Sequence, residues 1–166
     1  MKRLFTIGYE KTDVADFVHI LVAQKINVLL DIREIPISRR RGFSKTALGQ
    51  AVGASGIAYR HERQLGSPKA IRHRLREDGN YARFFREFER YLDQQRTLLE
   101  KLARELKGNV ALMCYEKDHT DCHRHSVAEA LAQLLGKTPI HLGVGDHARE
   151  ASEAARSYPR QGLSAA

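Results

Sequence analysis

The stretch NVALMCYE, residues 109 to 116, decides the fold that this chain can adopt. It is an almost continuous apolar run that follows Gly108. Runs of this kind are typical of parallel strands whose two faces are both covered by helices. We therefore expect 109–116 to be a central strand, with further strands beside it and helices above and below the sheet.

Other apolar segments supply the neighbouring strands, and segments of helical periodicity lie between them. The expected strands are 4–9, 27–34, 57–59 and 139–142. The expected helices are 14–23, a short helix capped by Ser44 that ends near Gly53, 81–106 as one long or two abutting helices, and 122–135. A basic loop with Gly66 and Pro68 is expected before residue 81. This alternation predicts an α/β fold, a single domain over residues 1–143 with a mainly parallel sheet of four to five strands flanked by helices.

Length and composition limit the class of protein. A chain of 166 residues, 42% of them hydrophobic, fits one domain, and residues 144–166 are expected to be a tail or a marginal helix. No apolar run approaches the roughly 18 residues of a membrane span. The start MKRLFTIGYE has too short an apolar stretch for a signal peptide. We therefore expect a cytoplasmic protein without a membrane partner, in which the two cysteines are reduced.

The net charge of +8 is concentrated in one part of the chain. The segment from Arg33 to Arg76 contains eleven lysines and arginines and two acids. Such a segment attracts polyanions through counterion release, so the expected partner is nucleic acid or a phosphorylated small molecule. The alternative is a solvated basic surface without a specific partner.

Polar residues follow each predicted strand. In open parallel sheets the ligand crevice lies outside the carboxyl ends of the strands. The four strand ends carry Gly8-Tyr9-Glu10, Asp31-Ile32-Arg33, Tyr59-Arg60-His61 and Cys114-Tyr115-Glu116. The sequence therefore predicts that the candidate chemistry lies at one edge of the sheet.

The segment MCYEKDHTDCHRHS, residues 113 to 126, allows a zinc site, a reactive thiol or a polar pocket. Cys114 and Cys122 are too far apart in sequence for the C-x2-4-C spacing of zinc knuckles, so zinc is the third alternative. Cys122 is expected at a helix N-terminus, where the helix dipole and the neighbouring His123 and Arg124 would lower the pKa of its thiol. That cysteine is then a candidate nucleophile, the alternative being a small structural cysteine.

Arg124 is expected to be buried, because it lies on the apolar stripe of the last helix, one turn before Val127 and Ala128. A buried guanidinium needs a partner, and the carboxylates of Asp31 and Glu116 are the expected ones. Either this is a structural clamp, or one side of Arg124 is free to bind a ligand phosphate or carboxylate.

Several spaced motifs resemble one family. TIGYE at the first strand, LLDIREIPISRRRGF at the second, GIAYRHERQLGSP in the middle, and MCYE followed by CHRH are similar to the domain of unknown function 488 family, over about residues 4 to 142. The resemblance implies an α/β domain with a strand-end cluster, but it supplies no established reaction. The cluster residues that it implies are Asp31, Arg33, Ser38, Arg39, Leu65, Gly66, Cys114, Glu116, Cys122, His123 and Arg124.

The favoured reading is a strand-end pocket next to a basic flank, in which two carboxylates close to an arginine divide acid and base roles. The expected catalytic residues are Asp31, Glu116 and Cys122, and the expected substrate-binding residues are Tyr9, Arg33, Ser38, Arg39, Tyr59, His123 and Arg124. The first hypothesis is a hydrolase or group transferase that acts on a nucleotide or nucleic acid. The alternative is a non-catalytic nucleic-acid-binding module with a structural Arg-carboxylate cluster. No dinucleotide or ATP fingerprint is present, and we expect no cofactor and no metal.

Overall fold

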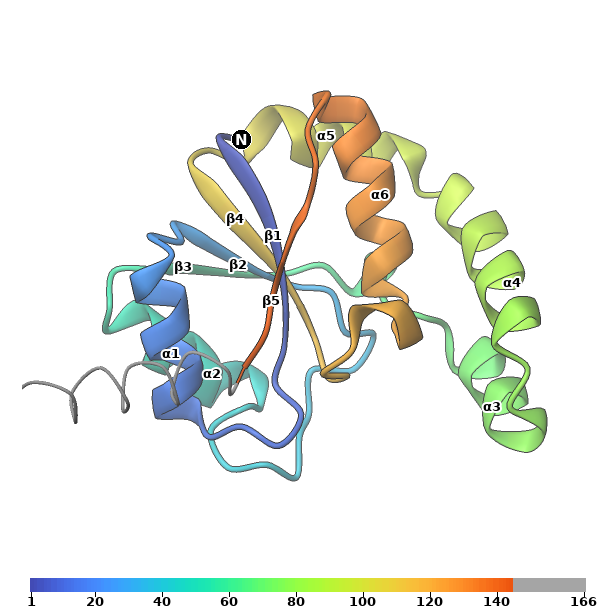
Figure 1. Ribbon diagram of the computed structural model, residues 1–166, viewed down its shortest axis with the longest axis horizontal. Coiled ribbons are helices and arrows are strands. Elements are labelled where there is room, and N and C mark those ends of the chain that lie inside the picture. The colour runs from blue at the N-terminus through green and yellow to red at the C-terminus, as the bar shows by residue number, and fades with distance from the viewer. Residues whose placement is uncertain (145–166) are drawn as a thin grey trace, which may run out of the picture.

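The computed structural model describes residues 1–144, and they form one five-stranded parallel sheet with the order β3-β2-β4-β1-β5 (Figure 1). The strands are β1 Arg3–Gly8, β2 Val28–Asp31, β3 Ala58–His61, β4 Asn109–Cys114 and β5 Ile140–Leu142. The apolar segment 109–116 thus contains the central strand β4, and the predicted α/β class is confirmed.

Both faces of the sheet are buried because successive apolar side chains along a strand point to opposite faces. In β4, Ala111 and Met113 belong to one hydrophobic core, and Val110 and Leu112 belong to the other. Successive side chains of a strand point to opposite faces, so an uninterrupted apolar run fills two cores at once.

Helices cover the sheet on both sides, as Figure 1 shows. Helices α1 Val14–Ala23 and α2 Lys45–Gly53 supply side chains to the first core. Helices α4 Tyr81–Asp93, α5 Arg96–Glu105 and α6 Arg124–Leu135 supply side chains to the second core. The segment 81–106 is therefore two abutting helices, one of the two arrangements expected.

The prediction of a loop before residue 81 is wrong, because Lys69–Asp78 forms helix α3. Its sequence is strongly polar and only Ile71 is buried, so it lacks the apolar stripe that reveals a helix. The helix packs against α4 and is joined to it by ion pairs from Arg74 to Glu87 and from Arg83 to Asp78. In the sequence, the cap residues Pro68 and Gly79 were the signal that could have revealed this helix.

Short turns change the borders of two other elements. The 3-10 turn η1 Arg63–Leu65 follows β3, and the 3-10 turn η2 His119–Asp121 precedes α6. Helix α6 begins at Arg124, so Cys122 lies before the helix in extended backbone. No helix within residues 1–144 has the length and apolar character needed to cross a bilayer. The predicted tail, apart from its first residue Val144, lies outside the described residues.

Candidate functional site

A cleft of about 580 Å³ opens at the carboxyl ends of β1, β2 and β4, where the sequence predicts the site. Helices α3 and α4 supply its other wall, with Arg76 from α3 and Tyr81 from α4. Six of the ten predicted site residues line this cleft, namely Tyr9, Arg33, Ser38, Arg39, Glu116 and His123. The other four are not part of its lining: Asp31, Cys122 and Arg124 are buried, and Tyr59 is partly buried.

The thiol of Cys114, the last residue of β4, lines this cleft. Its Sγ lies 3.2 Å from Oε2 of Glu116 and 3.7 and 3.9 Å from the two ring nitrogens of His123. The second thiol, Cys122, lies on the protein side of the cluster, 3.8 Å from Nδ1 of His123. One thiol therefore faces the cleft, while the other supports it from behind.

His123 is held in one orientation by the backbone. Its Nε2 donates a hydrogen bond to the carbonyl oxygen of Ile32, 3.0 Å away, and its ring packs edge-on against Phe88. Since a carbonyl oxygen only accepts, Nε2 carries the proton. The other nitrogen, Nδ1, faces the two sulfur atoms. There it can accept a proton from a thiol or bind a metal ion.

The environment separates the pKa values of the two thiols. A hydrogen bond from Cys122 lowers the pKa of Cys114 against the opposing effect of burial, and the charge of His123 lowers it further. Burial raises the pKa of Cys122, and the neighbouring Cys114 raises it further. Burial opposes the charge of His123, but the negative Cys114 outweighs it and raises the pKa of His123. The pair favours a Cys114 thiolate beside a His123 imidazolium.

The raised pKa of Cys122 contradicts the expectation that this thiol has a lowered pKa. From the sequence, this thiol is expected at a helix N-terminus that would lower its pKa, whereas it precedes α6 by two residues and is fully buried. Cys114 is the thiol with the lowered pKa, and although it is buried, with 4% of its surface exposed, it lies on the cleft lining. The sequence signal for it was its position at the carboxyl end of the central strand.

Glu116 provides the acid beside the thiolate. Burial raises the pKa of its carboxyl to about 7, and the charge of Cys114 contributes to the increase. The 3.2 Å contact between Oε2 and the Cys114 sulfur shares one proton, which these pKa directions assign to Glu116 below about pH 7. A protonated carboxyl next to a thiolate can donate its proton to a leaving group.

This raised pKa predicts how stability depends on pH. The ordinary pKa of a glutamic acid is 4.5, so folding favours the protonated form of Glu116. The stability that protonated Glu116 contributes to the folded state is complete below pH 4.5 and is lost as the pH rises through about 7. At about pH 8 we expect Glu116→Gln to be more stable than the wild type by roughly 1–3 kcal/mol, and at about pH 4.5 to be nearly equal to it. Urea denaturation across this range measures the difference, and equal pH dependence of the two proteins would contradict it.

Asp31 and Arg33 form a buried ion pair under the cleft. The carboxylate of Asp31, which is fully buried, accepts hydrogen bonds from the backbone N–H, Nε and Nη2 of Arg33 and from the hydroxyl of Tyr59. Burial opposes the charge of Arg33, but hydrogen bonding to Asp31 raises its pKa. The remaining guanidinium nitrogen of Arg33, Nη1, donates to the hydroxyl of Tyr9 and to the carbonyl of Phe43. The lone pairs of Asp31 are therefore used within the protein, where they orient Arg33.

Arg124 is buried as predicted, with 1% of its surface exposed, but the expected carboxylate partners are wrong. Its guanidinium donates to the backbone carbonyl oxygens of Glu116, at 2.7 Å, and Lys117, at 3.2 Å. A side chain at Gly8 would overlap the same carbonyl of Glu116, which explains the glycine of the TIGYE motif. Arg124 thus fixes the backbone that carries Glu116 over the cleft.

The basic segment is partly neutralised by neighbours. Arg60 pairs with Glu62 and Glu105, and Arg72 pairs with Glu34. Among residues 1–144, Arg39 and Arg76 on the cleft lining make no ion pair, and both are exposed. These two cations remain available to an anionic ligand.

Apolar side chains lie beside these cations. Ile35 and Ile37 are 51% and 76% exposed on the cleft lining, and Tyr115 and Tyr81 are 43% and 44% exposed. Exposed apolar groups that gather around a cleft commonly mark a ligand surface. Aromatic faces next to cations suit a ligand that carries both a flat ring and an anionic group.

Two clusters within the described part of the chain can hold a metal ion. Cys114, Cys122 and His123 form the first, and His119, His125 and His141 form the second. In the first cluster the sulfur-to-Nδ1 distances of 3.7 and 3.8 Å are close to those of zinc ligands, so the zinc alternative keeps a structural basis. A metal ion there would bind the Cys114 thiolate, which would then no longer be free to react in the cleft.

The parallel sheet, with a thiol and a carboxyl at its strand ends and a cleft over them, makes this an α/β protein with a candidate strand-end site. A sequence model for the family described as "Domain of unknown function DUF488" matches residues 13–131, and the chain belongs to this family. No curated protein matches the chain, and no solved structure matches it. Function must therefore be argued from the site itself.

Proposed function

We propose that the protein is an enzyme, a cysteine-dependent hydrolase or group transferase whose substrate is a nucleotide or another phosphorylated molecule. The observation that carries this proposal is the Cys114 thiol, which lines a cleft with His123 and Glu116 beside it. Thiolates with a lowered pKa are the reactive form of cysteine. This reading replaces Cys122 by Cys114 as the nucleophile and leaves Asp31 as a residue that positions Arg33.

The proposed reaction has two steps. The Cys114 thiolate forms a bond to an electrophilic carbon or phosphorus atom, and the bond from that atom to the leaving oxygen breaks. The proton of Glu116 passes to the leaving oxygen, while His123 stays charged and stabilises the thiolate. Water in a hydrolase, or an acceptor hydroxyl in a transferase, then displaces the cysteine and returns its proton to Glu116. The reaction needs Cys114 ionised and Glu116 protonated, a combination favoured below about pH 7.

The walls of the cleft support a phosphorylated substrate with a ring. Arg39 and Arg76, which make no ion pair within residues 1–144, supply guanidinium groups that match the bidentate geometry of phosphate. Tyr115 and the exposed isoleucines supply the apolar surface on which a nucleobase can lie. The same features suit nucleic acid, so the substrate class includes a nucleotide within a strand.

Alkylation by iodoacetamide, followed by mass mapping, tests the nucleophile. At about pH 6.5 we expect Cys114 to react at least tenfold faster than Cys122, because it lines the cleft and has the lowered pKa. A nucleoside monophosphate in excess should slow this reaction by filling the cleft. Cys114→Ser should abolish fast labelling, whereas the matched Cys122→Ser should keep Cys114 reactive but slow it, since the supporting hydrogen bond is lost.

Two outcomes would contradict the proposal. Equal labelling of both cysteines, or labelling of Cys114 only above about pH 8 as for an ordinary thiol, would remove the nucleophile. Binding of nucleic acid that is unchanged in Cys114→Ser and lost in the Arg39→Gln, Arg76→Gln double variant would then favour the non-catalytic binding module.

A further inference from the structure

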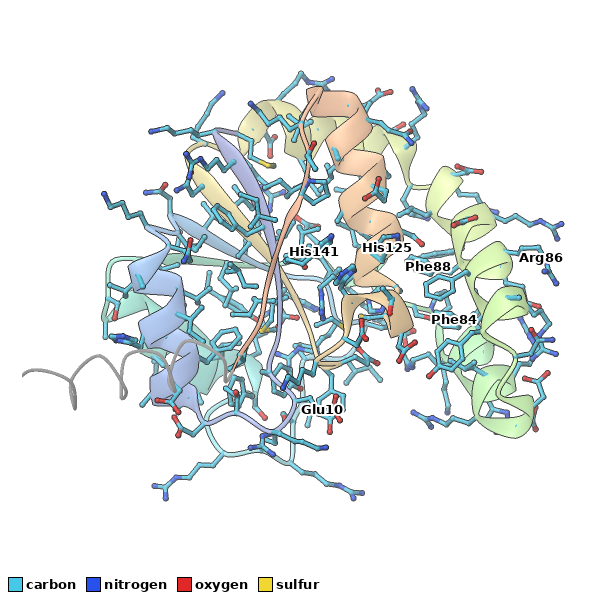
Figure 2. The ribbon with its side chains drawn as sticks, in the orientation of Figure 1. Glu10, Phe84, Arg86, Phe88, His125 and His141 are labelled. Atoms are coloured by element: carbon cyan, nitrogen blue, oxygen red, sulfur yellow. The ribbon has the colours of Figure 1, made fainter. Side chains whose placement is uncertain are left out.

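Three histidines from distant parts of the chain converge outside the cleft. His119 lies on the turn η2, His125 in the first turn of α6, and His141 on β5. Figure 2 shows His125 and His141 close together beside β5 and the start of α6. Ligand atoms of all three lie within 4.8 Å of one another. None of the three lines the cleft, so the group is separate from the proposed active site.

One pair of ring nitrogens already has the spacing of metal ligands. Nδ1 of His119 lies 3.3 Å from Nδ1 of His125. Two nitrogens bound to one zinc ion at 2.0–2.1 Å in a tetrahedron lie about 3.4 Å apart. In the metal-free protein a single proton must lie between these nitrogens, and an ion can take its place.

The third histidine is oriented by a buried hydroxyl. Nδ1 of His141 lies 2.8 Å from Oγ1 of Thr6, its register partner on β1, and Thr6 is fully buried. This contact leaves Nε2 of His141 for a ligand. Metal-binding histidines are usually oriented in this way by a hydrogen bond to the other ring nitrogen.

Two of the three imidazoles, those of His119 and His141, have lowered pKa values. Burial lowers the pKa of His141 to about 4, and the neighbouring histidines and Arg124 lower it further. Burial and His125 lower the pKa of His119. Imidazole binds a metal only as the neutral ring, so near neutral pH these two nitrogens compete weakly with protons.

We propose that His119, His125 and His141 bind a divalent transition metal of the zinc type, with three imidazole ligands and one open position. Imidazole ligands suit zinc, copper and nickel, whereas oxygen-seeking ions such as magnesium need carboxylates. The rings of His119 and His141 are stacked 3.5 Å apart, so one of them must turn to direct its lone pair at the ion. His119 is the ring that adjusts, by a tilt that keeps its Nδ1 beside His125, because it lies on a short turn whereas His141 is held by Thr6.

Titration of the chelator-treated full chain with Co²⁺ and with Zn²⁺ tests this site. We expect about one equivalent of Co²⁺ to give visible ligand-field bands without sulfur-to-cobalt charge transfer, and Zn²⁺ to displace it and raise the melting temperature. His119→Gln, His125→Gln and His141→Gln should each weaken binding at least tenfold. His73→Gln, which changes an exposed histidine on α3, and Cys114→Ser should leave binding intact.

A measurement on the wild type covers the case in which a variant fails to fold. Nitrogen NMR of the imidazoles should show three of the eight histidines shifting with Zn²⁺, His141 through Nε2. Failure to bind, cobalt spectra with thiolate charge transfer, or shifts confined to His123 would overturn the site. Each of these results concerns the histidine cluster and leaves the test of Cys114 alkylation unaffected.

Discussion

Asp31→Ala is expected to lower the free energy of unfolding by about 3–5 kcal/mol, because it leaves a buried guanidinium without its partner. Arg33 is 6% exposed and donates hydrogen bonds to both carboxylate oxygens of Asp31, at 2.9 and 2.6 Å. Removing the carboxylate also deprives the Tyr59 hydroxyl of its acceptor. Urea denaturation with linear extrapolation measures the change.

Two variants show whether the pair itself is responsible. Tyr59→Phe removes one hydrogen bond to the same carboxylate and should cost only about 1–2 kcal/mol. The double variant Asp31→Leu, Arg33→Met removes both charges and should recover part of the loss, since apolar residues often replace a buried ion pair without penalty. Unfolding of Asp31→Ala within about 1 kcal/mol of the wild type would show that solvent reaches Arg33.

The partner of Asp31 could have been predicted from the sequence as Arg33, instead of the expected Arg124. Residues two apart at the end of a strand point to the same side, so Arg33 is the nearest cation to Asp31. The two-residue spacing of Asp31 and Arg33 is therefore a stronger signal than the desolvation argument that linked Asp31 to a distant helix.

Strands and the helices with apolar stripes were predictable because their pattern records which faces are buried. The continuous run 109–116 predicted the central strand β4, and the period of 14–23 predicted α1. Helix α3 was missed because ion pairs with α4 and a single buried isoleucine hold it, and neither leaves a periodic pattern. The sequence therefore indicates elements that bury apolar surface and misses those held by polar contacts.

The site was predictable in place but not in assignment. Parallel strand ends gathered Tyr9, Arg33 and Glu116 at one edge, as the topology requires. The choice between Cys114 and Cys122 depended on where α6 begins, and an error of two residues reversed it. The histidine cluster depends on the pairing of β5 with β1, which no local pattern contains.

The other large effect is expected for Arg124→Leu, which should lower the free energy of unfolding by about 2–4 kcal/mol. Leucine fits the apolar stripe and also removes a buried charge, which by itself favours folding. The loss comes from the carbonyl oxygens of Glu116 and Lys117, which keep no other hydrogen-bond donor among residues 1–144. Both hydrogen bonds are partly buried, and a desolvated carbonyl that loses its donor costs about 1–3 kcal/mol, so we expect the unpaired backbone to outweigh the relief of the charge.

Arg124→Leu should also change the chemistry of the cleft, since Arg124 fixes the backbone on which Glu116 is placed beside Cys114. We expect the alkylation rate of Cys114 at about pH 6.5 to fall at least tenfold in this variant, while circular dichroism shows that the fold persists. Arg124→Lys can donate to one carbonyl and should recover about half of the stability. Glu129→Ala, on the exposed side of the same helix, should stay within about 0.5 kcal/mol of the wild type. A leucine variant as stable and as reactive as the wild type would mean that water already solvates these carbonyls, and that the burial of Arg124 has no role in placing Glu116.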